Sequence, residues 1–498
     1  MFSLILNCFI LLMILKSVLN KNLTEEIDVL VFLPKNNSFL FSQARVAPAI
    51  RYAQNALKTD FPNFHFTLNF ADSDSVNQAV FTFADRSCDH KPDLILGPVR
   101  EYEAAGVVRL ASHWNIPVIS AGALAVAFRN KDTEYSHLTR IAPSYMKMAE
   151  IFTAMFEHFT WRSALLLIED DMKERDCYFT LEAVFHVMED YTVRSLTFSQ
   201  EEPLRGDEML RNIHDVEVVI MCAGADRIRE IMLVAHDQQL TNGSYMFFNV
   251  DLFNASSYGN GSWRRGDEYD DNARQAYASL NTVTLLRTVK PEYRNFSIEI
   301  KTSTDRLGLH DCSDCGNVNM FVEGFHDAML LYTAALHEAI KNGYNKKNGR
   351  EITSYMWNTT FEGIAGQVSM DTNGDRNGDF SLMAMTNIEA GSYEVVVNYF
   401  GVNKTLQLLS AFNSKHFTIK GRHEANPELP QKSCELGVSA LTGVTVGALL
   451  GAVMLIAFYF FRKNYRIIIQ RRTHCEAPYR GKHHQLKEDS IKANTSAA

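Results

Sequence analysis

The run DVLVFL, Asp28–Leu33, decides the fold class, because five consecutive apolar residues after one carboxylate predict a strand buried on both faces. The next segment, Val46–Leu57, has apolar residues at helical spacing. A strand buried on both faces needs helices on both sides, so the pair predicts an α/β domain with a parallel sheet. Further strands are expected at Phe64–Phe70, Asp93–Leu96 and Pro117–Ser120, and further helices at Asn77–Ala84 and Glu101–Trp114.

The alternation of strand and helix then begins a second time. Ala164–Ile168 predicts a buried strand, and Tyr178–Met188 predicts the helix that covers it. Because each run of alternation forms its own sheet, we expect two doubly wound lobes, at about 26–145 and 146–310, with later crossovers. The other expected elements are strands at Val193–Phe198, Val216–Met221 and Tyr245–Asn249 and helices at Asp226–His236 and Asn317–Lys341.

The segment Asp371–Asp375 lies between two strand-like runs, Gln367–Met370 and Phe380–Ala384, and predicts a hairpin turn. Its alternating Asp and Asn resemble a calcium loop, but Leu382 stands where that loop needs a bidentate Glu. No metal site is therefore expected. The sequence has no Gly-rich phosphate loop, no GxSxG and no HExxH, so we expect no enzyme activity.

Two long apolar segments indicate a membrane protein. Phe2–Leu19 contains one charged residue and predicts a signal peptide over residues 1–20, the alternative being a first membrane anchor. Gly437–Phe461 is 25 residues long, has no charge and is long enough to cross a bilayer. Basic residues follow it directly, which predicts a cytoplasmic C-terminal side. The expected order is an extracellular ligand-binding domain at 21–410, a juxtamembrane stalk at 411–436, a transmembrane helix at 437–461 and a cytoplasmic tail at 462–498.

Charge and glycosylation motifs agree with this single-pass type I topology. The chain has a formal net charge of −9, although the tail from Arg462 carries nine Lys or Arg against three Asp or Glu. An acidic exterior suits a cationic ligand, and nothing in the sequence indicates nucleic-acid binding. Eight N-x-[ST] motifs precede the expected span and are predicted glycosylation sites: Asn22, Asn36, Asn242, Asn254, Asn260, Asn295, Asn358 and Asn403.

Several long segments resemble the natriuretic peptide receptors. Among them are YSHLTR at Tyr135–Arg140, NMFVEGFHD at Asn319–Asp327 and FEGIAGQV at Phe361–Val368. The similarity runs from about Asp28 into the tail. It implies a periplasmic-binding-protein type I fold of two lobes. It also implies a plasma-membrane receptor that works as a homodimer and holds one cyclic peptide hormone between two ectodomains.

Within this family the chain most resembles the type C, or clearance, branch or a variant of it. Cyclase-type members carry kinase-like and cyclase domains inside the cell, whereas 37 residues follow Phe461 here, too few for a catalytic domain. The resemblance implies a receptor that binds A-, B- and C-type natriuretic peptides and clears them by internalisation. The alternative is signalling through inhibitory G proteins, for which the matching basic residues are Arg471, Arg472, Lys482 and Lys487. A stop-transfer role would explain the first basic cluster without any partner.

The resemblance also implies two binding sites. The residues that match peptide contacts are Tyr102, Arg109, Glu134, Tyr135, Tyr178 and Phe198; read without the family, they would be ordinary surface or core residues. Ile168 stands where the family has a pocket tyrosine, which is a departure from the pattern. A chloride ion is expected at Ser73 and at the backbone N–H groups of Val99 and Arg100.

Six of the eight cysteines lie between the two apolar segments, where the oxidising exterior favours pairing. Cys177 and Cys222 match a family disulfide, and Cys434 matches a bridge between the two chains of the dimer. The family's first-lobe disulfide is missing, because its positions are Ser75 and Arg100. Cys312 and Cys315 are expected to form a local disulfide in preference to a zinc or redox site. Cys88 is then left over, either buried or linking dimers.

Overall fold

The computed structural model describes residues 24–253, 263–286, 290–306, 315–414, 416–419, 454 and 459–460. By its contacts the chain divides into one unit that ends at Arg422 and a second that begins at His423. Among the described residues, no helix has both the length and the hydropathy needed to cross a membrane. The expected span at 437–461, the signal peptide at 1–20 and the tail at 462–498 lie outside the described residues, apart from Met454, Tyr459 and Phe460.

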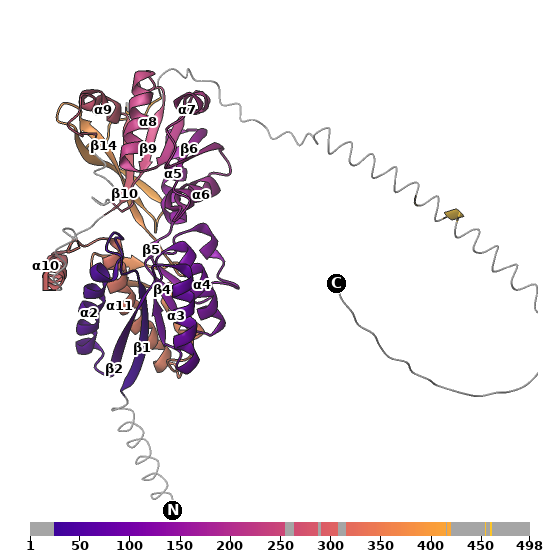
Figure 1. Cartoon of the computed structure of the whole chain (residues 1–498), viewed down its shortest axis with the longest axis vertical. Helices are drawn as coiled ribbons and strands as arrows, with labels where there is room; N and C mark the ends of the chain where they lie inside the picture. Colours follow the sequence, from indigo (N-terminus) through magenta and orange to yellow (C-terminus); the bar gives the residue numbers. More distant parts are fainter. Residues whose placement is uncertain are drawn as a thin grey trace, which may run out of the picture. The chain divides into compact units, whose positions relative to one another are not determined.

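The first sheet has six strands in the order β13-β5-β4-β3-β1-β2, and every pair in it is parallel. Helices α3 and α4 cover one face, and α2 and α11 cover the other (Figure 1). The strands are β1 (Glu25–Leu33), β2 (Phe64–Asp72), β3 (Leu94–Leu96), β4 (Val118–Ser120), β5 (Leu138–Pro143) and β13 (Asp375–Arg376). The helices are α2 (Gln43–Asp60), α3 (Val76–Asp89), α4 (Glu101–His113) and α11 (Met320–Lys341), with α12 (Gly349–Met356) beside α11.

Strand β1 shows why a continuous apolar run is needed at this position. Val29 and Val31 point into the core that α2 and α11 complete. Leu30 and Phe32 point to the opposite core, which α3 and α4 complete. Successive side chains of a strand alternate between faces, so a strand with helices on both sides must be apolar throughout. The prediction made from Asp28–Leu33 is confirmed.

The second sheet has eight strands in the order β16-β15-β14-β10-β9-β8-β6-β7. Strands β6 to β10 pair in parallel, and β14 to β16 add an antiparallel edge. The strands are β6 (Ser163–Asp170), β7 (Thr192–Ser199), β8 (Val218–Cys222), β9 (Met246–Val250), β10 (Leu280–Leu285), β14 (Asp379–Asn387), β15 (Ser392–Phe400) and β16 (Thr405–Leu408). Its helices are α5 (Tyr145–Phe159) and α6 (Asp176–Val187) on one face and α7 (Gly206–Ile213), α8 (Ala225–Asp237) and α9 (Asp270–Tyr277) on the other.

The chain passes between the two lobes three times, after β5, after β10 and after β13. After β10 it forms α10 (Pro291–Arg306), which packs on α2 of the first lobe: Phe296 contacts the Tyr52 ring at 5.2 Å between centroids. The expected second lobe at 146–310 therefore runs too far, because the apolar stripe of α10 is buried against the first lobe. Two α/β lobes joined by several crossovers fit the periplasmic-binding-protein-like fold.

Two expectations near the end of the described unit need correction. Strand β12 (Gln367–Ser369) pairs with β11 (Thr360–Glu362), whereas β14 pairs with β10 and β15. The predicted turn at Asp371–Asp375 is confirmed, because Met370 and Arg376 form an antiparallel bridge across it. The predicted partner strand is wrong, since the turn leads into β13 of the first sheet and not directly into β14. The expected stalk begins too early, since Phe417 is buried and stacks on Phe159 of the second lobe.

Candidate functional site

The candidate peptide site begins where β3 turns into α4. Gly97 has a φ of +80°, and a Cβ there would lie 2.4 Å from the carbonyl oxygen of Phe32, so only glycine fits. The turn brings Arg100 to the N-cap of α4 and places Tyr102 in its first turn. Ligands of open α/β sheets bind at this carboxyl edge of the strands.

Three of the predicted peptide-contact residues form one cluster on the first lobe. Arg109 of α4 donates to Glu134 at 3.0 Å, and both side chains are about half exposed. The Arg109 guanidinium lies 5.0 Å from the centre of the Tyr135 ring. Tyr135 itself is buried and packs on Phe128. Tyr135 therefore supports the arginine from beneath, while Arg109 and Glu134 face solvent.

Tyr102 and Tyr178 form a second cluster, where the two lobes meet. Tyr102 is 40% exposed, and its ring meets the Phe179 ring edge-on at 5.9 Å. Arg175 lies 4.1 Å from the centre of the Tyr178 ring and interacts electrostatically with Tyr102. Its hydrogen bonds to Asp170 lower the pKa of that carboxyl. An aromatic surface thus continues from α4 across to α6.

Phe198 and Ile168 lie apart from these two clusters. Phe198 is on β7, where the Arg227 guanidinium lies 5.7 Å from its ring centre. No described contact joins Phe198 to the other predicted peptide residues. Ile168 is on β6 and is 5% exposed, within the apolar core that α5 and α6 cover. At this position an aliphatic side chain completes the core and presents no polar group.

The predicted chloride residues lie around the side chain of Arg100. Ser73 is buried at the end of β2, and Arg100 donates to the backbone oxygens of Ser73 and Asp74 at 3.1 and 2.7 Å. The same guanidinium pairs with Glu103 at 2.5 Å and with Glu174 of the second lobe at 2.6 Å. Ser75, the other position of the missing disulfide, caps α3 by accepting from the N–H of Gln78.

Several of the cysteines and glycosylation motifs lie in the described part of the chain. The Cys177–Cys222 disulfide is present and ties the start of α6 to the end of β8. Cys315 is disulfide-bonded, and Cys88 is a free, exposed cysteine on α3, so it is not buried. Cys312 and Cys434 lie outside the described residues, as do Asn22, Asn254, Asn260, Arg471, Arg472, Lys482 and Lys487. The asparagines of the other five motifs, Asn36, Asn242, Asn295, Asn358 and Asn403, are all exposed.

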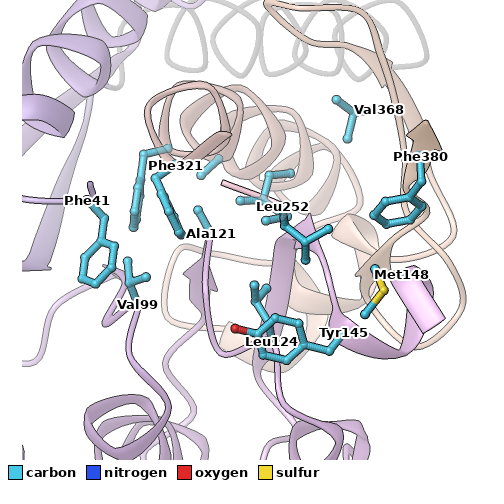
Figure 2. Packing of buried hydrophobic residues seen from close by; sticks show 14 of the residues in the cluster. Phe41, Val99, Ala121, Leu124, Tyr145, Met148, Leu252, Phe321, Val368 and Phe380 are labelled. Atoms are coloured by element: carbon cyan, nitrogen blue, oxygen red, sulfur yellow. The ribbon is translucent and has the colours of Figure 1, made fainter. Parts of the chain in front are cut away.

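The fold also creates a cavity that the sequence did not suggest. It measures about 150 Å³ and lies between the lobes beside the Arg100 network. Its walls are Phe39, Phe41, Val99, Arg100, Glu101, Gly122, Leu124, Tyr145, Asp171, Glu174, Asp176, Phe253 and Phe321. Figure 2 shows Phe41, Val99, Leu124, Tyr145 and Phe321 of this wall within the surrounding apolar core. In the sequence, the carboxylates between Asp170 and Asp176 could have indicated a site here, but they do not reveal that Arg100, about 70 residues earlier, lies beside them.

Comparisons with known proteins agree with this architecture. The family model "Receptor family ligand binding region" matches residues 45–388. The chain is 52% identical to atrial natriuretic peptide receptor 3 of Rattus norvegicus, over 95% of this chain and 92% of that protein. The human protein of the same name is also 52% identical, over 95% and 91%. Atrial natriuretic peptide receptor 2 of Rattus norvegicus is 32% identical, over 77% of this chain but 38% of that protein. The chain therefore belongs to the natriuretic peptide receptor family.

Proposed function

We propose that this chain is a cell-surface receptor that binds natriuretic peptides and clears them by internalisation. The observation that carries the proposal is the match to the type 3 receptors along almost their whole length. The type 2 receptors contain a long region with no counterpart in the 498 residues of this chain. Because the close relatives along almost the whole chain are type 3 receptors, we propose a receptor without enzyme activity.

The geometry supports peptide capture on the exposed face of α4 and α6. Glu134 offers a carboxylate to basic residues of a peptide, and such charge-assisted pairs are strong and directional. In the second cluster, Tyr102, Phe179 and Tyr178 offer aromatic contact area, as binding hot spots commonly do. The proposed homodimer, joined through Cys434, would let a second copy hold the same peptide from the other side.

A chloride ion fits the residues near Arg100 in part. The Ser73 hydroxyl is buried, and the N-terminus of α4 supplies unpaired backbone N–H groups, which together suit an anion. The Arg100 guanidinium is already neutralised by Glu103 and Glu174. In this proposal the ion is held by the Ser73 hydroxyl and the N–H groups of Val99 and Arg100, and it would steady the turn that positions Tyr102.

The proposal includes a membrane topology and a role for the cytoplasmic tail. A plasma-membrane, single-pass type I receptor agrees with the cell-surface relatives and with the five exposed glycosylation motifs. Coupling to inhibitory G proteins through the basic tail is not favoured over clearance by any described contact. A non-reducing gel of the Cys434→Ser variant tests the bridge between the two copies, because a monomeric band is expected.

The test of the function is uptake by cells that express the full chain. We expect saturable internalisation of labelled A-, B- or C-type natriuretic peptide without production of cyclic GMP. Tyr102→Ala should weaken peptide binding by about tenfold or more, since truncating a central aromatic anchor removes most of its contact energy. Glu189→Gln, an exposed change at the far end of α6, is the control. The absence of binding to all three peptides would refute the proposed function.

A further inference from the structure

The cavity beside Arg100 is lined by two chemically different kinds of side chain. The apolar wall contains four phenylalanines, Phe39, Phe41, Phe253 and Phe321, and the ring of Tyr145. Phe41 contacts Phe321 edge-on at 5.1 Å, and Phe253 stacks on the same ring at 5.3 Å. The lining also includes four acidic residues, Asp171, Glu174 and Asp176 from the second lobe and Glu101 from the first. A ligand here would meet both aromatic and acidic side chains.

Glu101 is the residue that points to a ligand. It is 8% exposed, lines the cavity and accepts the N–H of Leu124 through Oε1 at 3.1 Å. Its second oxygen, Oε2, is buried and has no hydrogen-bond partner among the described residues. A buried carboxyl oxygen without a partner carries the full cost of losing its water, so it favours a ligand that donates to it.

The acidic residues that line the cavity favour a cationic ligand over an anionic one. Arg100 is the one cationic side chain in the cavity wall, and its guanidinium is already engaged by Glu103, Glu174 and two backbone oxygens. Burial and the nearby Asp176 raise the pKa of Glu101 to about 8, although backbone N–H groups of Ala125 and Leu124, and then Arg140, act in the opposite direction. An additional positive charge between Glu101 and Asp176 would relieve both the desolvation and the repulsion.

We propose that this cavity binds a small organic cation, in which an ammonium or guanidinium group is carried on a compact apolar body. A bare metal ion does not suit it, because no group of three or more His, Cys, Asp or Glu in the described part of the chain is placed to hold one. A volume of about 150 Å³ suits a single ring, since an apolar cavity of that size binds benzene. The aromatic wall attracts a cation through the ring faces and also buries its apolar body.

The proposal rests on the cavity and does not depend on peptide binding, so its test uses direct binding to the purified full chain. The probe is benzylammonium, which combines one ring with one primary ammonium group, and the matched neutral probe is benzyl alcohol. We expect benzylammonium to bind by calorimetry at concentrations up to about 10 mM, as expected for a ligand of so few atoms. Benzyl alcohol should bind at least tenfold more weakly, because it lacks the charge that the carboxylates favour.

Two variants locate the site. Glu101→Gln and Asp176→Asn should each weaken benzylammonium binding by about tenfold, because each removes a charge-assisted hydrogen bond. Glu101→Gln keeps the shape of the protonated acid and should fold normally. If Glu101→Gln does not fold, benzylammonium binding to Asp176→Asn still tests the site. Glu189→Gln removes a carboxylate at the other end of α6 and should leave binding unchanged. Equal binding of the two probes, no benzylammonium binding, or binding that survives both variants would overturn the proposal.

Discussion

At the scale of single residues, Arg100 connects the loop after β3 to the loop after β2 through hydrogen bonds. By the family resemblance, Ser75 and Arg100 stand at the two positions expected to carry a disulfide between the loops after β2 and β3. The Arg100 side chain reaches the same loop by donating to the carbonyl oxygens of Ser73 and Asp74. It also extends to Glu174, so it connects the two lobes, which the disulfide would not do.

The first prediction concerns this arginine. Arg100→Met should lower the free energy of unfolding by about 3–5 kcal/mol, because it leaves the buried carboxylate of Glu103 without its partner. The double variant Ser75→Cys/Arg100→Cys should form a disulfide and recover about 2–4 kcal/mol relative to Arg100→Cys alone. Denaturant unfolding with and without reducing agent measures both. An Arg100→Met protein as stable as the parent would show that the network contributes little.

At the scale of elements, one buried ion pair fixes the strand that leads into the last crossover. Arg140 of β5 is fully buried and donates to both oxygens of Asp375 on β13 at 2.6 Å, across 235 residues of sequence. Its Nη1 group donates to the carbonyl oxygens of Ala123 and Ala125. Lys131 lies 3.5 Å from Asp375, and burial lowers its pKa to about 7. A strand of two residues is held at the sheet edge mainly by this cluster.

We therefore expect Asp375→Asn to destabilise the protein by about 3–5 kcal/mol, since it leaves the Arg140 charge buried and unpaired. The pair Arg140→Met/Asp375→Leu should cost much less than the sum of its single variants, because no lone charge remains. Thermal unfolding of the parent, Arg140→Met, Asp375→Leu and the double variant gives the coupling energy between the two side chains. Additive single effects would indicate that the two side chains act independently.

Some of these elements could be predicted from the sequence, and others could not. Strands β1, β6 and β8 contain continuous apolar runs, so they could be predicted from local pattern alone. Strand β5 was missed because its sequence, LTRIAP, contains an arginine that is buried only through a partner far along the chain. The peptide residues came from the family resemblance. The cavity could not be predicted, since Glu101 and Asp176 come together only when the lobes pack.

At the scale of the whole molecule, one seam between the lobes lies between the start of α4 and the start of α6. Two contacts between described residues cross it, the ion pair of Arg100 with Glu174 and the ring contact of Tyr102 with Phe179. Glu101 lies in the same turn of α4 and is buried behind them. The seam therefore brings together the proposed peptide contacts, the replacement for the disulfide and the cavity. Changes in the charge of Glu101 should affect how firmly the lobes hold together.

The last prediction follows from that buried carboxyl. Burial raises the pKa of Glu101 from 4.5 to about 8, so the folded protein binds a proton that the unfolded chain releases between these pH values. Its contribution to stability is present in full below pH 4.5 and is lost as the pH rises to about 8, at up to about 1.4 kcal/mol per pH unit. His137 works in the opposite sense, because burial lowers its pKa to about 4. The difference between the parent and Glu101→Gln cancels that contribution, since both proteins retain His137.

We expect the stability of Glu101→Gln, relative to the parent, to increase steadily from pH 5 to pH 8 in denaturant titrations, whereas Glu189→Gln should follow the parent. A constant difference between the parent and Glu101→Gln over this range would mean that Glu101 is ionised in the folded protein, and that the cavity already supplies it with a positive partner.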